Sequence, residues 1–355
     1  MAEHNTEYSS PLYLPHHPTS SVLNRGLVEL LHDRDTVTIW EVIDSLLTSM
    51  TLPPSDILEY IAIYRDSIST VYIPPDELTI NFHLVRKYGL MLPQLYPDGV
   101  IFRDQKTISL TILQIKCLLC HMVLGSLPKQ FEWKETSRAS VYYRHVLFYY
   151  LSLDNDTNDR CVTCTHHTIA PCQWEQLPEV LHQSDICTGT IEDNSIKNKV
   201  VFSNKNFGPG PGGTQEELIF GSYPETCVFP LFFSRSLRDS EVVLISQVLR
   251  VAEYSGYGRE VEFKSFIEPS AEYHTLLLMD ALEIDLFEDK KEEFSNENIT
   301  RELNKCFCGF SQFTGGDIAT GRWGCGAFGG TYSLKKRIQQ FAANRAKVNI
   351  IFCEI

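Results

Sequence analysis

Two adjacent glutamates, Glu216 and Glu217, follow a loop rich in glycine and proline that spans residues 208–213. A carboxylic acid can protonate the departing oxygen of a sugar, and a neighbouring carboxylate can stabilise the positive charge that develops on the sugar carbon. Backbone N–H groups in a glycine-rich loop can closely approach a bound anion. The combination predicts chemistry at a sugar, in a ligand that also carries an anionic group.

A second glycine-rich stretch, residues 319–330, precedes a basic amphipathic helix predicted at residues 335–343. Glycines before a helix N-terminus can form a cradle for an anion, and Phe328 offers an aromatic face for a ribose or a base. A tight turn between domains, with Trp323 and Phe328 in the core, is the structural alternative. Because one of the two loops carries paired carboxylates, we favour a ligand with phosphates and sugars.

The first loop has other interpretations. Its glycines at 208, 210 and 213 formally match the dinucleotide-binding fingerprint, but Pro209 and Pro211 remove amide donors where pyrophosphate would bind. A nicotinamide-dependent oxidoreductase is therefore a weak alternative. Glu216 and Glu217 could also be carboxylates of a first helical turn, which the helix dipole favours. No Gly-x-Ser-x-Gly motif supports a serine hydrolase.

The cysteines raise the question of a metal site. Cys161, Cys164 and Cys172, with two histidines between them, have a spacing that could suit zinc. No second pair completes the site in the usual form, and the alternation of residue types favours a strand with a half-buried Cys164. Cys117 and Cys120 lie one helical turn apart and are expected to be small core residues. We predict no metal site.

Strands and helices must position the two loops. The pattern predicts a strand at residues 200–203, before the first loop, and the start of a helix at residues 216–220, after it. The remaining candidate strands are residues 186–191, 242–251, 261–266, 276–279 and 348–352, and the remaining candidate helices are residues 229–233, 300–310 and 333–345. This mixture predicts an α/β domain.

The first half of the chain has a different pattern. Apolar residues recur there mostly at helical spacing, and residues 108–127 read as one strongly apolar helix. The predicted organisation is a disordered N-terminal tail (1–21), a helical accessory region (22–150), a linker and insertion (151–185) and an α/β domain (186–355).

Composition restricts the class of protein. The chain has 355 residues, of which 43% are hydrophobic, and a formal net charge of -14. The negative charge argues against nucleic-acid binding through a basic surface. No apolar run approaches the length of a membrane span, and no secretory signal region is evident, so we expect a cytosolic or nuclear protein without a membrane partner. The 11 cysteines are expected to be mostly buried thiols.

Six segments, in order, resemble the signature region of the poly(ADP-ribose) glycohydrolase family. They are Gly189–Glu192, Val200–Asn204, the glycine loop with Gln215–Glu217, Glu253–Tyr257, Arg301–Lys305 and Ala319–Gly330. The resemblance extends over about residues 186–355, whereas the helical first half is only loosely similar to the family's accessory region.

The resemblance implies a macrodomain-like three-layer α/β/α sandwich with an N-terminal, mainly α-helical accessory region. The implied ligand is the terminal ADP-ribose of poly(ADP-ribose), and the implied reaction is hydrolysis of its ribose–ribose O-glycosidic bond without a metal or other cofactor. The implied partners are poly(ADP-ribose) and ADP-ribosylated proteins, and we expect a monomer.

The same resemblance implies roles for individual residues. Glu217 is the general acid and then the base, and Glu216 holds ribose hydroxyl groups. Asn204 and Gln215 line that pocket, and Tyr257 packs near the ligand. The other implied contacts are backbone donors from Gly326, Ala327 and Phe328 to the diphosphate, and Ile191 and Glu192 at the adenine.

The chain also departs from the family pattern. Val201 stands where the family has an aspartate, which would remove a carboxylate from the ribose pocket, and Arg322 stands where it has an asparagine. The glycine loop is shorter and contains two prolines. These departures leave open a second hypothesis, a weak or inactive paralogue that binds ADP-ribose or poly(ADP-ribose).

Overall fold

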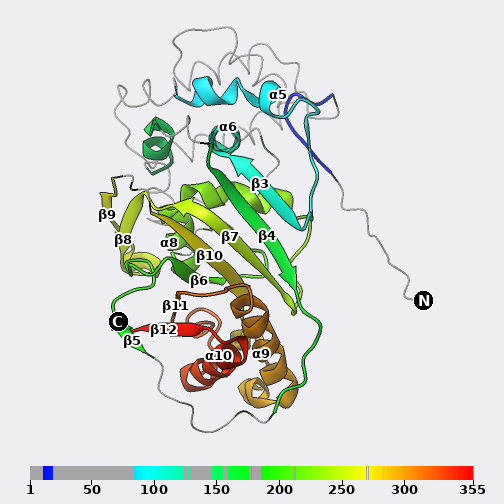
Figure 1. Cartoon of the computed structure of the whole chain (residues 1–355), viewed down its shortest axis with the longest axis vertical. Coiled ribbons are helices and arrows are strands. Elements are labelled where there is room, and N and C mark those ends of the chain that lie inside the picture. Colours follow the sequence, from blue (N-terminus) through cyan, green and yellow to red (C-terminus); the bar gives the residue numbers. More distant parts are fainter. Residues whose placement is uncertain are drawn as a thin grey trace, which may run out of the picture.

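The computed structural model describes residues 11–18, 84–123, 127, 146–154, 159–175, 177, 185–210, 213–268, 270 and 272–354. Its centre is a mixed sheet of eight strands in the order β3-β4-β7-β10-β6-β11-β12-β5 (Figure 1). The strands in this order are Thr107–Thr111, Cys161–Thr168, Glu241–Leu249, Tyr273–Asp280, Asn198–Ser203, Asp317–Thr320, Asn349–Glu354 and Ile186–Thr188.

One half of the sheet is parallel and the other antiparallel. Strands β10, β6, β11, β12 and β5 pair with one another in parallel. Strands β3, β4, β7 and β10 pair in that order antiparallel, so that β10 joins the two halves. The central strands β6 and β10 carry unbroken apolar runs at Val200–Val201 and Leu276–Met279, and all of these residues are buried. Such runs are typical of strands that are covered on both faces.

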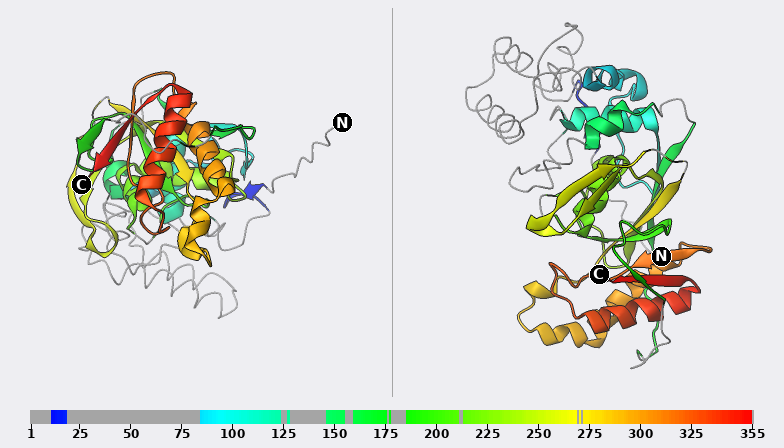
Figure 2. Two further views of the ribbon diagram at one scale, coloured as in Figure 1. Left: turned by 90° about the horizontal axis from the view of Figure 1, so that it is seen from below. Right: turned by 90° about the vertical axis from the view of Figure 1, so that its left-hand side faces the viewer.

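Helices cover both faces. Helices α9 (Asn296–Phe310) and α10 (Tyr332–Ala346) pack against each other on one face, where their apolar residues join Val200 and Leu277 in one core. Helices α6 (Ile112–Val123) and α8 (Gln215–Ser222) and the 3-10 helix η1 (Pro224–Phe232) cover the other face (Figure 2). This arrangement is the α/β/α sandwich that the resemblance implied.

Shorter elements surround this sandwich. Strands β8 (Ala252–Ser255) and β9 (Glu262–Phe266) form a hairpin whose tip carries Tyr257. Strand β1 (Leu12–Tyr13) pairs with β2 (Val100–Ile101). The remaining short helices are α5 (Leu92–Leu95), η2 (Gly258–Glu260), η3 (Ile284–Leu286) and η4 (Lys290–Phe294).

The first half of the chain differs from the sequence prediction in one clear respect. The apolar run at 108–127 is not one helix, because residues 107–111 form strand β3 with alternating exposure and helix α6 begins only at Ile112. Strands β3 and β4 lie before residue 186 and still belong to the main sheet. Most of the predicted accessory region (22–150) lies outside the described residues, and the division into domains stays a prediction.

Two further predictions concern short segments. Cys161–Thr168 is a strand, as the alternation indicated, but Cys164 is fully buried rather than half-buried. Residues 11–18 were assigned to a disordered tail; the structure instead pairs Leu12 and Tyr13 with β2 and buries Leu14. The rest of that tail lies outside the described residues.

Two kinds of feature are absent from the described ranges. No helix there is both long and apolar enough to cross a membrane. Also within those ranges, no cluster of three or more His, Cys, Asp or Glu side chains could hold a metal ion.

Candidate active site

A cavity lies where two neighbouring parallel strands diverge. Strands β6 and β11 pair over only two residues, Ile318 with Asn198 and Ala319 with Lys199. The chain leaves β6 for helix α8 on one face of the sheet, and leaves β11 for α10 on the other. Such a reversal opens a crevice beyond the carboxyl ends of the strands, where ligands of α/β proteins bind.

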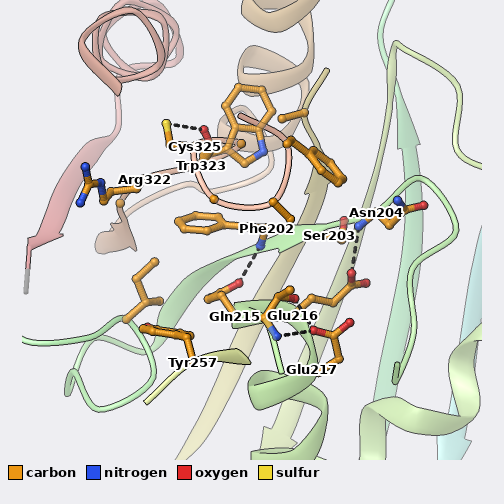
Figure 3. Close-up of a pocket in the computed structure, with 18 of the residues that line it drawn as sticks. Phe202, Ser203, Asn204, Gln215, Glu216, Glu217, Tyr257, Arg322, Trp323 and Cys325 are labelled. Atoms are coloured by element: carbon orange, nitrogen blue, oxygen red, sulfur yellow. Dashed lines mark hydrogen bonds between the residues drawn. The ribbon is translucent and has the colours of Figure 1, made fainter. Parts of the chain in front are cut away.

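A cavity of about 660 Å³ fills this crevice. Figure 3 shows side chains from β6, the start of α8, the hairpin tip and the second glycine loop around it. The lining residues are Thr190, Ile191, Phe202, Ser203, Asn204, Gly213, Thr214, Gln215, Glu216, Glu217, Tyr257, Gly258, Ala281, Gly321, Arg322, Trp323, Gly324, Cys325, Gly326, Ala327, Phe328 and Cys353.

The side chain of Gln215 occupies the edge of β6 that β11 leaves free. Its Oε1 accepts the N–H of Phe202 at 2.8 Å, and its Nε2 donates to the carbonyl of Val200 at 3.1 Å (Figure 3). These are the backbone groups that a neighbouring strand would otherwise pair with. Gln215 therefore fixes the start of α8 against β6 as well as lining the cavity.

Glu216 is a buried carboxylate that holds the glycine loop. Its two oxygens accept the N–H of Asn204 at 2.9 Å and of Gly208 at 3.0 Å, and the residue is only 5% exposed. Burial raises the pKa of Glu216 well above its usual value, and the charge of Glu217 acts in the same direction, while the two N–H donors oppose the shift. The loop backbone therefore fixes the position of Glu216, and burial is the main reason that its charged form is disfavoured.

Glu217 is held by the cap of its own helix. Thr214 is the N-cap residue of α8, and its backbone N–H donates to Oε2 of Glu217 at 2.6 Å, with a further hydrogen bond from its hydroxyl. This is a capping box, which satisfies a free N–H at the start of the helix. The other oxygen, Oε1, faces the loop, where a Cβ at Gly210 would lie only 2.8 Å away. The carboxylate is thus anchored on one side and closely bounded on the other.

The second glycine loop forms the opposite wall. Trp323 is fully buried, and its indole N–H donates to the carbonyl of Met279 at 3.0 Å. The turn beyond it is closed by hydrogen bonds from Gly329 N–H to Gly326 and from Gly330 N–H to Gly324. The N–H groups of residues 326–328 donate to no residue in the described ranges. They are available to an anion at the cavity wall.

The far end of the cavity lies under the hairpin tip. Ile191 is buried and lines the wall, and Tyr257 is 39% exposed with its hydroxyl 3.3 Å from Oε2 of Glu192. Glu192 does not line the cavity; it is 5% exposed and lies behind Tyr257, and burial raises its pKa. The N–H of Gly258 donates to the carbonyl of Gly213 at 2.6 Å, which ties the tip to the first loop.

The structure brings together all of the predicted site residues except Glu192 around one cavity. Val201, by contrast, is fully buried in the apolar core on the α8 side and does not line the cavity. The expectation that this position faces the ribose pocket is therefore wrong for this chain. Val201 packs in the core beneath α8, and the residues of β6 that line the cavity are the two that follow it, Phe202 and Ser203.

Sequence reasoning missed several lining residues. The capping role of Thr214 could have been predicted from the sequence, because Thr-x-x-Glu is a capping-box pattern. Ser203 lines the cavity with a buried hydroxyl that has no partner among the described residues, and Cys353 reaches the cavity from the last strand. Neither has a local sequence pattern that would have revealed it.

The family described as poly(ADP-ribose) glycohydrolase with a macro domain fold matches residues 171–355. This chain belongs to that family. Its α/β/α sandwich is accordingly a macrodomain fold, and its family is one of glycosidases.

Relatives of this chain are found in Caenorhabditis elegans and Arabidopsis thaliana. Poly(ADP-ribose) glycohydrolase 1 of Caenorhabditis elegans is 32% identical over 199 residues, which is 50% of this chain and 25% of the relative. Poly(ADP-ribose) glycohydrolase 2 of the same organism is 27% identical over 188 residues, 46% of this chain and 38% of the relative. The Arabidopsis thaliana glycohydrolase 1 is 33% identical over 135 residues, 34% of this chain and 23% of the relative. The chain thus matches only about a quarter to two-fifths of these proteins.

Solved structures of the family are also similar. Poly(ADP-ribose) glycohydrolase from Thermomonospora curvata aligns with 78% of this chain and 93% of its own, at 12% identity and a TM-score of 0.35. The Deinococcus radiodurans enzyme in complex with ADP-ribose aligns with 48% of this chain and 76% of its own, at 14% identity and a TM-score of 0.31.

Proposed function

We propose that this chain hydrolyses the ribose–ribose O-glycosidic bonds of poly(ADP-ribose) and releases ADP-ribose. The observation that carries the proposal is the placement of Glu217 at one end of the cavity. Its carboxylate is fixed through Thr214 and lies beside a second, buried carboxylate, Glu216. A glycosidase needs such a pair next to the scissile bond.

The proposed ligand lies along the whole cavity. A volume of about 660 Å³ is within the range of pockets for small ligands, roughly 300–1,000 Å³. The terminal ribose occupies the end with Asn204, Gln215 and the glutamates. The diphosphate accepts hydrogen bonds from the N–H groups of residues 326–328, and the adenine lies between Ile191 and Tyr257, with Glu192 behind the tyrosine.

The proposed chemistry uses the two carboxylates differently. Glu217, in its protonated form, gives a proton to the departing ribose oxygen while the bond to the anomeric carbon breaks. The resulting carboxylate then accepts a proton from the attacking water, as microscopic reversibility requires. Glu216, whose two oxygens are held by the N–H groups of Asn204 and Gly208, holds the ribose hydroxyl groups.

The test is release of ADP-ribose from purified poly(ADP-ribose) by the wild type, Glu217→Gln and Glu216→Gln. Loss of a general acid removes about 10²–10⁴-fold in rate, so Glu217→Gln is expected to lose turnover and keep most of its affinity for ADP-ribose. Glu262→Gln, on the exposed strand β9, is the matched control and is expected to behave like the wild type.

The outcomes separate the hypotheses. Equal rates for Glu217→Gln and wild type would remove Glu217 from the acid role, and loss of turnover in Glu216→Gln alone would transfer that role to Glu216. If the wild type binds the polymer and releases no ADP-ribose, the chain is a protein that binds poly(ADP-ribose) and does not cleave it.

We extend the proposal to ADP-ribosylated proteins as partners and to a monomer that works without a metal or other cofactor.

A further inference from the structure

Two cysteines from opposite ends of the domain sequence meet at the edge of the main sheet. Cys187 on β5 and Cys353 on β12 are register partners in parallel neighbouring strands, and their Sγ atoms are 3.0 Å apart. Adjacent strands place Cα atoms about 4.8 Å apart, which lies within the span of about 4.4–6.8 Å that a disulfide bridges. The two thiols can therefore be joined by a small movement of their side chains.

An amide donor serves both sulfur atoms. Nδ2 of Asn194 lies 2.9 Å from Sγ of Cys187 and 3.6 Å from Sγ of Cys353. The orientation of this amide is fixed, because its Oδ1 accepts the N–H of Ile196 at 2.7 Å. A hydrogen bond donated to sulfur favours the thiolate, which is the reactive form.

A buried ammonium group adds positive charge to this environment. Nζ of Lys199 donates to the carbonyl of Ile191 at 2.7 Å, and its charge favours the thiolate of Cys353. Burial nevertheless raises the pKa of Cys353 to about 12, and its hydrogen bond with Cys187 acts in the same direction. Cys353 therefore stays protonated at neutral pH, and the more exposed Cys187 is the sulfur that an oxidant meets first.

We propose that Cys187 and Cys353 form a redox-active dithiol that hydrogen peroxide converts reversibly into a disulfide. The sulfur of Cys187 attacks one peroxide oxygen, the O–O bond breaks, and water leaves, so that Cys187 becomes a sulfenic acid. The sulfur of Cys353 then attacks that of Cys187, the S–O bond breaks, and the thiol proton leaves with hydroxide as water. Two thiols lose two electrons to one peroxide, and a small thiol reverses the change by exchange.

The two thiols lie at the wall of the candidate active-site cavity. Cys353 lines the cavity and packs with Ile191 in a small apolar cluster, and Gly189 N–H donates to the carbonyl of Glu354 at 3.1 Å. Closing the sulfurs to the bond length of about 2.0 Å pulls Cys353 towards β5 by roughly 1 Å. We expect this movement to loosen the wall beside Ile191, so that the oxidised form binds ADP-ribose several-fold more weakly. This last expectation rests on the proposed function.

The first experiment maps the linkage in the full chain. The reduced protein is treated with hydrogen peroxide, remaining thiols are blocked with N-ethylmaleimide, and peptides are identified by mass spectrometry. A cross-linked pair containing Cys187 and Cys353, lost after dithiothreitol, is the expected result. Cys187→Ser and Cys353→Ala abolish it, whereas Cys325→Ser, which changes the other cysteine that lines the cavity, leaves it intact. If N-ethylmaleimide still labels Cys187 and Cys353 after peroxide treatment while other cysteines are oxidised, the proposal is overturned.

The second experiment tests the role of Asn194. Asn194→Asp keeps the acceptor for Ile196 and replaces the N–H donor with a negative charge beside the sulfurs. The rate of disulfide formation with peroxide is expected to fall roughly tenfold or more, since the thiolate becomes less favourable. An unchanged rate would show that the amide does not activate the pair.

The third measurement compares ADP-ribose affinity of the oxidised and reduced protein, with Cys187→Ser treated in the same way. A weaker Kd only in the oxidised wild type supports the link to the cavity, and equal Kd values contradict it. The disulfide is mapped without ADP-ribose, so the two proposals can fail separately. A protein that forms the disulfide but binds no ADP-ribose would refute the proposed function and still support the redox-active cysteine pair.

Discussion

Replacement of Gly210 by alanine perturbs the position of Glu217 without touching its chemistry. The new Cβ would lie 2.8 Å from Oε1 of Glu217 and 3.6 Å from its Cγ and Cδ, while ordinary contact begins at 3.4 Å. The new methyl group therefore clashes with one atom only, Oε1 of Glu217. Since Gly210 does not have a positive φ, an alanine backbone fits at this position, and the carboxylate is the group that must move.

The size of the effect follows from this geometry. The carboxylate has to shift by about 0.6 Å, against the hydrogen bonds from Thr214 that hold its other oxygen. A misplacement of about 1 Å at a reacting centre can reduce a rate about 10²-fold. We therefore expect Gly210→Ala to lower kcat about tenfold, which corresponds to roughly 1.4 kcal/mol of activation free energy.

The assay is initial-rate release of ADP-ribose from poly(ADP-ribose), with Tm and the Kd for ADP-ribose measured on the same samples. Gly315→Ala is the control, because a Cβ there meets no atom within 4 Å. The control should match the wild type in all three measurements, and Gly210→Ala should differ in kcat alone. A wild-type kcat for Gly210→Ala would refute the idea that the placement of this carboxylate limits turnover.

Three further predictions use other parts of the molecule. Thr214→Val removes the hydroxyl hydrogen bond to Glu217 and should lower the free energy of unfolding by about 1 kcal/mol in urea denaturation, with a fall in kcat. Burial lowers the pKa of His121 to about 4, below the value of about 6.5 in the unfolded chain. The contribution of neutral His121 to the free energy of unfolding is therefore present above pH ~6.5 and is lost towards pH ~4, by up to roughly 3 kcal/mol. Urea denaturation midpoints measured across this range should depend less on pH in His121→Gln than in the wild type. The guanidinium of Arg322 lies over the ring of Tyr332, 5.1 Å from its centre, and lines the cavity. If poly(ADP-ribose) is the ligand, Arg322→Asn should weaken its binding and lower the slope of log K against log salt concentration by about one, in titrations at several salt concentrations.

The core of the site could be predicted because its pattern is local. An apolar strand, a glycine loop and Thr-x-x-Glu stand next to one another in the chain, and the structure has β6 and α8 at these positions. The second glycine loop was proposed as an anion cradle from its glycines. The specific roles of Ile191 and of residues 326–328 came from the family resemblance, since nothing in their spacing places them beside Glu217. Only the divergence of β6 from β11 brings them together.

Other features were not readable from the sequence for physical reasons. A short apolar run can be a strand or part of a helix, and residues 107–111 became a strand because β4 lies beside them. The contact between Cys187 and Cys353 joins residues 166 positions apart and depends on strand register, which has no local pattern. That Val201 packs in the core also depends on a tertiary contact, because residues of α8 cover it.

The hydrogen bond between Gly258 and Gly213 has a mechanical consequence. It joins the tip of the β8–β9 hairpin, next to Tyr257, to the residue before Thr214, which holds Glu217. The contact is close, because a Cβ at Gly213 would lie 2.6 Å from the carbonyl oxygen of Gly258. Any movement that lifts Tyr257 therefore also pulls on Gly213 and, through Thr214, on the carboxylate of Glu217. If the proposed function holds, release of the nucleotide and displacement of the general acid are mechanically coupled.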